Sequence, residues 1–215
     1  MCLLVVTHAR LPGDVVTKAT PPSNPRTVER QPGDRAPAPR DLGLVQSFVN
    51  TSWDLDHDGE EELRSPRELA AWLSERRLLG SGTKLTTADL KRALDVREGL
   101  RALLFINNGA TLDEAAIERL NCALGRTALA VRFDADAGPQ LASRGRDLDA
   151  ALGSLASMVA VAQIDGSWSR LKACRGVHCG WAFYDHSFNQ SGHWCSMSIC
   201  GSRSKAREYR RRQRR

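Results

Sequence analysis

The sequence has no apolar run long enough to cross a bilayer. Met1–Val6 is too short for a secretory core, and Ala150–Ile164, at fifteen residues, is better explained as a buried helix. The chain also lacks a Ser-His-Asp signature, a Gly-rich phosphate loop and an H-E-x-x-H motif. We therefore expect a cytoplasmic protein that is not an enzyme, although an active site assembled only by the fold would leave no such motif.

Cysteine is scarce, and four of the six cysteines fall in the last 42 residues. They form two C-x4-C pairs separated by fifteen residues, at Cys174, Cys179, Cys195 and Cys200. A C-x-x-C pair is absent, which disfavours a redox dithiol, and nothing points to an oxidising compartment in which two disulfides would form. Two close thiolate pairs favour one tetrahedral Zn²⁺, and a closed set of four sulfur ligands indicates a structural metal.

Three histidines lie close to these cysteines in the sequence, at His178, His186 and His193. Any of them could replace a cysteine as a ligand. Because four thiolates already complete a tetrahedron, we expect all three histidines at the surface.

Positive charge is concentrated at the C-terminal end. Residues 168–215 contain eleven Lys/Arg and two Asp/Glu, whereas the other 167 residues contain twenty and twenty-three. A cationic helix attached to a zinc module can neutralise DNA phosphates, although a solubilising tail is the alternative. The expected DNA contacts are Arg203, Lys205, Arg207, Arg210, Arg211 and Arg212. The first three are closest to the metal and are therefore candidates for reading base edges.

The cysteine pairs and their flanks carry a specific pattern that resembles the CGNR zinc finger family of bacterial proteins. It consists of Cys174-x4-Cys179-Gly180-Trp181-x-Phe183-x-Asp185-x-Ser187-x-Asn189, Trp194-Cys195-Ser196-Met197-x-x-Cys200-Gly201-x-Arg203-x-Lys205 and Tyr209-Arg210-Arg211. In that family the finger follows an ABATE domain, and this combination of two domains implies a stress-induced transcription regulator. Ser202 replaces the family's Asn but keeps a hydrogen-bonding cap. Gly192 and His193 replace basic residues and so remove charge from the insert.

The rest of the chain divides by composition. Residues 1–40 hold seven of the nine prolines and are expected to be a disordered leader. A helical, ABATE-like domain is expected over 41–165, followed by the zinc finger over 168–215. We predict a mostly α fold with a small β-hairpin (α+β), in which the finger is treble-clef-like or knuckle-type and ends in a basic helix.

Helix starts and one hairpin can be placed from local signals. Capping patterns predict helix starts at Ser65-Pro66-Arg67-Glu68, Thr86-Thr87-Ala88-Asp89 and Thr111-Leu112-Asp113-Glu114. Alternation of side-chain character predicts strands at Ala128–Phe133 and Gly138–Ser143. An apolar run predicts a helix over Leu148–Ile164. Asp165-Gly166-Ser167 is interpreted as a hinge between the two modules.

Two arginines on an apolar helix face suggest a second site. Arg97 and Arg101 are four residues apart and project from the same side, so they could hold a small anionic ligand together with Asn50 and Trp72. Internal pairing with Asp or Glu is the favoured alternative. The ABATE domain has a similar Val-Asn-Thr start and Arg-x-x-x-Arg helix. The acidic loop Asp54–Glu62 matches a calcium loop incompletely and is expected to be solvated.

Together these features predict a cytoplasmic, nucleoid-associated, DNA-binding transcription regulator with one structural Zn²⁺ and a helical domain that senses a small molecule. The alternative is a zinc-containing interaction protein that docks on RNA polymerase, other transcription machinery or RNA.

Overall fold

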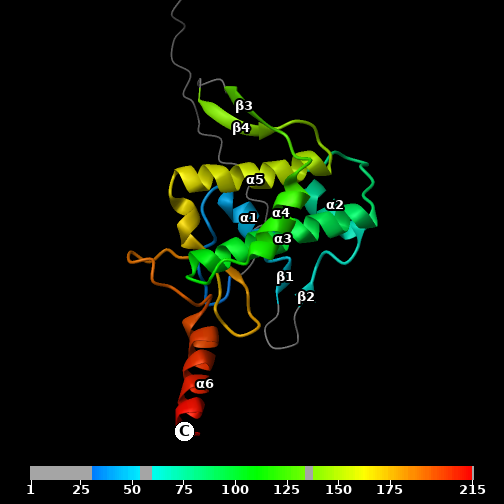
Figure 1. Ribbon diagram of the computed structural model, residues 1–215. Helices are drawn as coiled ribbons and strands as arrows, with labels where there is room; N and C mark the ends of the chain where they lie inside the picture. Colours follow the sequence, from blue (N-terminus) through cyan, green and yellow to red (C-terminus); the bar gives the residue numbers. More distant parts are fainter. Residues whose placement is uncertain (1–30, 54–59, 134–137, 215) are drawn as a thin grey trace, which may run out of the picture.

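The computed structural model describes residues 31–53, 60–133 and 138–214. Within these ranges the chain is mostly helical with small two-stranded antiparallel sheets, as the sequence predicts (Figure 1). No described helix has the length and apolar character needed to cross a membrane. The elements are α1 (Leu42–Val49), β1 (Ser52–Trp53), β2 (Glu60–Glu61), α2 (Pro66–Glu75), α3 (Thr87–Asn107), α4 (Glu114–Leu124), β3 (Leu129–Phe133), β4 (Pro139–Ser143), α5 (Leu148–Ile164), the 3₁₀ turn η1 (Ser167–Arg170), β5 (Leu171–Ala173), β6 (Ala182–Tyr184), the π-helical turn η2 (Met197–Gly201) and α6 (Ser202–Gln213).

Side-chain caps define the helix starts. The Ser65 hydroxyl accepts a hydrogen bond from the Glu68 amide at 3.3 Å, and Thr86 and Asp89 form a complete capping box. Both predicted starts are confirmed. The predicted third start at Thr111 is wrong by two residues, because the Asp113 side chain caps α4 by accepting from the Ala116 amide.

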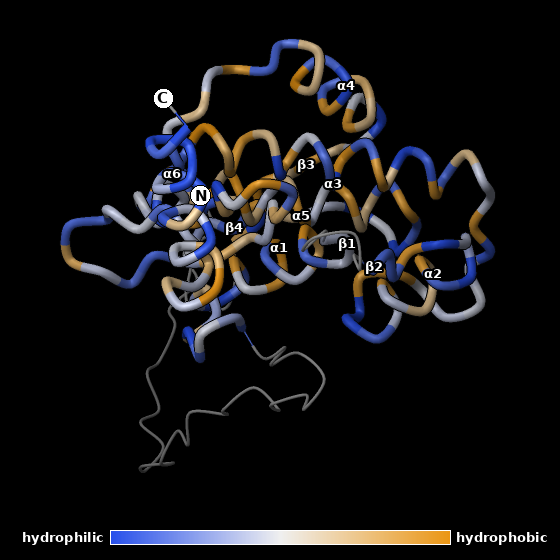
Figure 2. The backbone as a smooth tube through the Cα atoms, turned by 90° about the horizontal axis from the view of Figure 1, so that it is seen from below, coloured by the Kyte–Doolittle hydropathy of each residue, from blue (hydrophilic) through white to orange (hydrophobic). Residues whose placement is uncertain are grey.

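The main core forms where α1, α3 and α5 meet, and hydrophobic residues gather along these helices (Figure 2). In α1, Val45, Phe48 and Val49 have no exposed surface, and Leu152 and Leu155 of α5 are equally buried. Helix α5 is apolar around most of its circumference because it lies between α1 on one side and strand β4 on the other. The predicted helix over Leu148–Ile164 is therefore confirmed.

The predicted β3–β4 hairpin is also confirmed and packs on α5 (Figure 1). Its register pairs Val131 with Leu141 and Phe133 with Pro139. Because paired residues of an antiparallel ladder project to the same face, Leu129, Val131 and Leu141 share one apolar face of the hairpin.

The main core continues past α5 into the C-terminal part of the chain. Strand β6 alternates, so that Ala182 and Tyr184 join the main core while Trp181 and Phe183 pack with the four cysteines. Trp168 and Leu171 are also buried in the main core. Asp165–Ser167 is thus a tight turn within one shared core, and the hinge interpretation is wrong.

Candidate metal centre and nucleic-acid interface

The four predicted zinc ligands converge at one point. The sulfur atoms of Cys174, Cys179, Cys195 and Cys200 all lie within 4.8 Å of one another, and all four residues are buried. The Cys179–Cys195 and Cys195–Cys200 sulfur pairs are each 3.7 Å apart. A tetrahedron with zinc–sulfur bonds of about 2.3 Å has sulfur–sulfur edges of about 3.8 Å, so the four sulfurs fit one structural Zn²⁺. The described cysteines form no disulfide.

The four thiols shift one another's pKa because they lie so close together. Hydrogen bonds from Cys179, and then from Cys195 and Cys200, lower the pKa of Cys174. Hydrogen bonds with Cys174, Cys179 and Cys200 raise the pKa of Cys195. Four thiolates this close repel one another, so they ionise together only around a positive ion.

A glycine allows the two cysteine pairs to approach closely. A Cβ atom on Gly176 would lie 3.0 Å from both the Cys179 Cβ and the Cys200 Sγ. The Gly176 amide also donates a hydrogen bond to the Cys174 Sγ at 3.3 Å. The backbone between Cys174 and Cys179 therefore turns around the Cys174 sulfur.

Each of the three histidines is exposed and lies outside the sulfur cluster, as predicted.

The insert between the cysteine pairs is organised by a buried ion pair. The Lys172 Nζ lies 2.9 Å from the Asp185 Oδ2, and both side chains are at most 5% exposed. Burial raises the pKa of Asp185, but hydrogen bonds from Ser187, Lys172 and Gly192 outweigh it and hold that pKa well below its usual value. Asp185 is therefore ionised and ties both ends of the insert to β5.

Helix α6 begins immediately after the last metal ligand. The Ser196 hydroxyl accepts from the Ile199 amide and caps η2, which contains Cys200 and continues into α6. No residue of α6 is buried, and the helix projects away from the rest of the protein (Figure 1). Its direction is set by the turn that carries Cys200.

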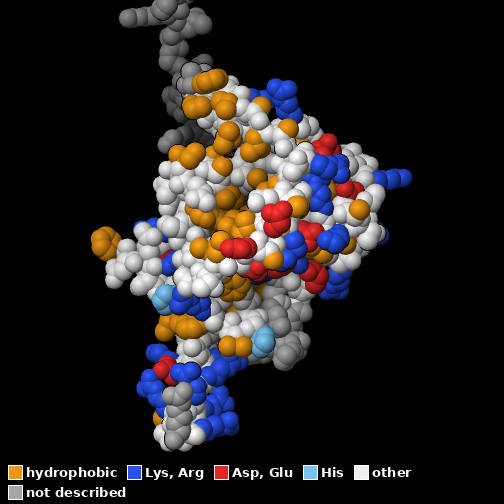
Figure 3. Space-filling view, viewed as in Figure 1, with side chains coloured by type: hydrophobic (Ala, Val, Ile, Leu, Met, Phe, Trp, Pro, Cys, Tyr) orange, Lys and Arg blue, Asp and Glu red, His pale blue; other side chains and the backbone are white. Residues whose placement is uncertain are grey.

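The cations of α6 lie on two faces. At 3.6 residues per turn, four arginines of α6 and the C-cap Arg214 occupy one face: Arg203, Arg207, Arg210, Arg211 and Arg214. The opposite face carries Lys205 and Arg212, and Arg212 pairs with Glu208. In Figure 3 blue Lys and Arg side chains cover most of the visible surface of α6. The six predicted DNA contacts are therefore divided, with four on the arginine face and Lys205 and Arg212 opposite.

One basic residue of this surface was not predicted. Arg175 lies in a small hollow with Arg203 and Arg207, between the first cysteine pair and the start of α6. Arg175 thus lies beside the start of the arginine face, with its guanidinium next to Gly109 at the end of α3. Its position directly after Cys174 could have indicated from sequence that it lies beside the metal site.

Helices of the N-terminal part hold the zinc module in place. The side-chain amide of Asn50 forms two hydrogen bonds with the backbone of Ala182, at 2.7 and 2.9 Å. Asn108 donates to the carbonyl oxygens of Ala173 at 2.7 Å and His193 at 3.0 Å. Ala173 directly precedes the ligand Cys174. The position of the first cysteine pair is thus fixed from outside the finger.

Residues 31–40 fall within the predicted disordered leader, and the prediction needs correction there. Arg35 donates to the carbonyl oxygens of Cys195 at 2.8 Å and Trp194 at 3.2 Å, and its guanidinium lies over the Phe183 ring. The Gln31 side chain accepts from the Trp181 indole at 3.0 Å. This segment binds the zinc module through partners distant in sequence, which composition does not reveal. Residues 1–30 lie outside the described residues.

Three of the four residues predicted to hold an anionic ligand are hydrogen-bonded to protein groups, and the fourth, Trp72, is packed against Phe48. Arg97 makes two hydrogen bonds of 2.7 Å to the carboxylate of Glu61, and its side chain is 5% exposed. Arg101 donates to three carbonyl oxygens and Asn50 to Ala182. These contacts correspond to the favoured alternative of internal pairing. In the acidic loop, residues 54–59 lie outside the described residues.

The sequence matches two protein-family models. One is described as CGNR zinc finger and covers residues 170–213. The other is ABATE, described as "Putative stress-induced transcription regulator", and covers residues 42–165, more than half of the chain. The chain belongs to the ABATE family. The predicted resemblance to both families is confirmed, and a search of curated proteins found no match. The ABATE domain contributes α1 to α5, and the CGNR finger contributes the four cysteines and α6.

Proposed function

We propose that this ABATE protein is a DNA-binding transcription regulator that uses the arginine face of α6. The observation that carries the proposal is the alignment of five arginines on one exposed side of a helix that starts at the metal. Residues on that face can contact consecutive phosphates or base edges without rearrangement of the protein.

The dimensions of α6 suit a DNA groove. Twelve residues give a helix about 18 Å long, and a helix with its side chains fits the major groove, which is about 12 Å wide. Arg203 and Arg207 are nearest the rigid metal module, so we assign them to base edges. Arg210, Arg211 and Arg214 are assigned to phosphates.

The zinc ion has a structural role in this proposal. The four cysteines would hold it in a closed shell, which fixes the start of α6 relative to the body of the protein. We propose no catalytic step. We retain a sensing role for the ABATE domain, because its helices hold both cysteine pairs and can transmit a change to them.

The experiment is recovery of genomic DNA bound by the native protein, followed by competition with random duplex. A shared sequence motif, and preference for it over random duplex of at least a hundredfold, would support the proposal. If the protein binds all duplexes equally, or prefers RNA or RNA polymerase, the interaction-protein alternative takes its place.

A further inference from the structure

We propose that the cavity between α5, β4 and residues 39–42 binds an amphipathic organic cation, such as a hydrophobic amine. The cavity has a volume of about 680 Å³ and opens to solvent. That volume suits a small molecule. The proposal rests on the proposed function only in treating the cavity as the sensing site of the ABATE domain. None of the four residues predicted from sequence for a ligand lines it.

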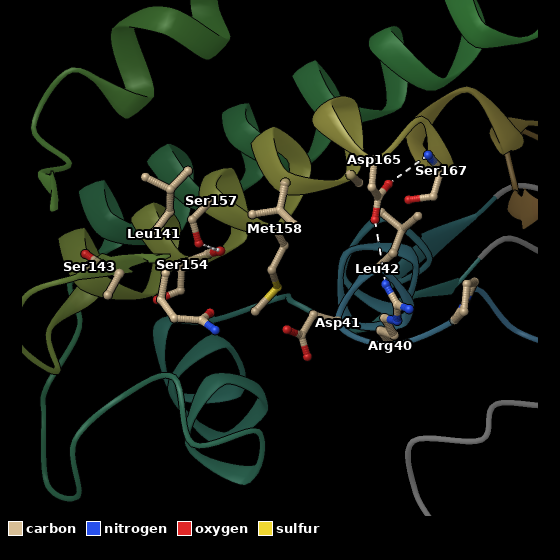
Figure 4. Close-up of a pocket in the computed structure, with 15 residues that line it drawn as sticks. Arg40, Asp41, Leu42, Leu141, Ser143, Ser154, Ser157, Met158, Asp165 and Ser167 are labelled. Carbon is tan, nitrogen blue, oxygen red and sulfur yellow. Dashed lines mark hydrogen bonds and ion pairs between the residues drawn. The ribbon is translucent and has the colours of Figure 1, made fainter. Parts of the chain in front are cut away.

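One wall of the cavity is apolar. Met158 and Val161 of α5 line this wall together with Leu42 and Leu141. Met158, Leu42 and Leu141 are labelled in Figure 4. Val161 is 48% exposed, so this part of the apolar wall is open to solvent. The apolar hairpin face that carries Leu141 continues outward to Val131, which is 61% exposed. A ligand in the cavity would therefore bury an alkyl chain or a ring between α5 and the hairpin.

Three serine hydroxyls of the cavity are available only as hydrogen-bond acceptors. The Ser154 hydroxyl donates its proton to the Ala150 carbonyl at 2.8 Å, and the Ser157 hydroxyl donates to the Ser154 carbonyl at 2.7 Å. The Ser143 hydroxyl donates to the Ala128 carbonyl at 3.3 Å. A hydroxyl has one proton and two lone pairs, so each of these oxygens can only accept from a ligand. These three hydroxyls therefore favour a hydrogen-bond donor in the bound group, whereas Gln140 and Arg40 of the same lining can also donate.

The charge of the cavity selects a cation among possible donors. Arg40 and Asp165 form an ion pair at 3.9 Å and largely cancel each other. Asp41 also lines the cavity, beside the end of Met158, and forms no ion pair with any described residue (Figure 4). Its carboxylate leaves the lining with a net negative charge. An ammonium group supplies three donors and the complementary charge.

The test uses three probes with the same alkyl chain: decylamine, decanol and decanoic acid, each below its micelle concentration at pH 7. The chain has three methionines, of which Met158 lines the cavity and Met197 belongs to the zinc module. ¹³C-methyl NMR of the intact, zinc-loaded protein therefore contains both a reporter and an internal reference. We expect decylamine to shift the Met158 signal alone and to bind at least about fivefold more tightly than decanol. Decanoate should bind most weakly.

Two variants and one control variant locate the site. Asp41→Asn should remove the preference for decylamine over decanol, whereas Asp95→Asn, the same change at a residue of α3 that does not line the cavity, should keep it. Val161→Arg places a cation in the cavity at a half-exposed position and should abolish binding of decylamine. The proposal is overturned if decanoate binds as well as decylamine, if Asp41→Asn binds like the wild type, or if Met158 and Met197 shift together. Binding of DNA, followed separately by anisotropy, shows whether only this inference or the proposed function has failed.

Discussion

Arg101 donates a hydrogen bond of 2.7 Å to the carbonyl oxygen of Gly180, the residue that follows the metal ligand Cys179. The same guanidinium donates to the carbonyl oxygens of Val49 and Ser52, both at 2.7 Å. One side chain of α3 thus joins the end of α1, strand β1 and the first cysteine pair. Its side chain is 11% exposed, so these bonds are largely shielded from water.

Replacement of Arg101 by Met should therefore affect both stability and zinc binding. Three carbonyl oxygens lose a charged donor, which we expect to cost about 3 kcal/mol in the free energy of unfolding. Zinc affinity, measured by competition with a chromophoric chelator, should fall about tenfold. Arg119→Met on the exposed side of α4 is the control and should change neither quantity. Loss of stability with unchanged zinc affinity would show that Arg101 does not position the metal site.

The Arg97–Glu61 pair predicts a pH dependence. Burial raises the pKa of Glu61, but hydrogen bonds from Arg97 and the Leu63 amide outweigh it, so the pKa lies below its ordinary value of 4.5. A lowered pKa stabilises the folded protein above the ordinary value, and this contribution disappears as the pH falls through the lowered value. Glu61→Gln should thus lower the free energy of unfolding by about 2 kcal/mol at pH 7.

Urea unfolding of wild type and variant at pH 7 and pH 4 measures this effect. The difference between the two proteins should be smaller at pH 4, because Glu61 of the unfolded chain, with its ordinary pKa of 4.5, takes up a proton there while folded Glu61 still resists protonation. Glu60→Gln, an exposed neighbour on β2, is the control and should show a small difference at both pH values. A difference that does not change with pH would contradict an ionised Glu61–Arg97 pair.

Gly176→Ala tests the close approach of the two cysteine pairs. The added Cβ would lie 3.0 Å from the Cys200 Sγ, so the sulfur cluster must expand. We expect zinc affinity to fall by tenfold or more, and ¹¹³Cd NMR of the substituted protein should report the change in geometry. Gly125→Ala adds a Cβ that fits at 3.4 Å and should leave the affinity unchanged. Equal affinities for the two variants would mean that Gly176 has no role in ligand geometry.

Removal of the metal should destabilise the whole protein. Trp168, Leu171 and Ala182 belong to the main core, so the zinc module cannot unfold without exposing that core. Chelation, or Cys195→Ser, should lower the single melting temperature by roughly 10 °C or more, given that about 1 kcal/mol shifts a chain of this size by roughly 2–4 °C. Two separate transitions in calorimetry, with the upper one unchanged, would show that the ABATE domain and the finger are independent.

The elements with strong local signals were predictable from sequence. Capping residues such as Ser65 and Thr86 place helix starts because a side chain satisfies the free amides of the first turn within three residues. The four zinc ligands were equally predictable, since the paired spacing of the cysteines reflects ligand geometry. The start of α4 was misplaced because Thr111 and Asp113 both offer a capping oxygen, and only the structure shows that Asp113 is used.

The joining of the two modules was not predictable from local pattern. The contacts of Asn108, Arg101 and Asn50 with the zinc module span 65 to 132 residues of sequence, and a single sequence carries no signal for such pairs. Arg35 was missed for the same reason, since its partners are about 160 residues away. The division of α6 into two faces could have been predicted from helical periodicity, which places Lys205 and Arg207 on opposite sides.

That division gives the most direct test of DNA binding by the arginine face. Affinity for a duplex is measured against salt concentration for the wild type and for Arg207→Ala and Lys205→Ala, two variants that each remove one positive charge from α6. The arginine-face account predicts that Arg207→Ala weakens binding at least tenfold, whereas Lys205→Ala retains wild-type affinity and salt dependence within about twofold. Equal losses for both variants would mean that α6 acts only as a diffuse positive charge, and unchanged affinity for Arg207→Ala would contradict the account.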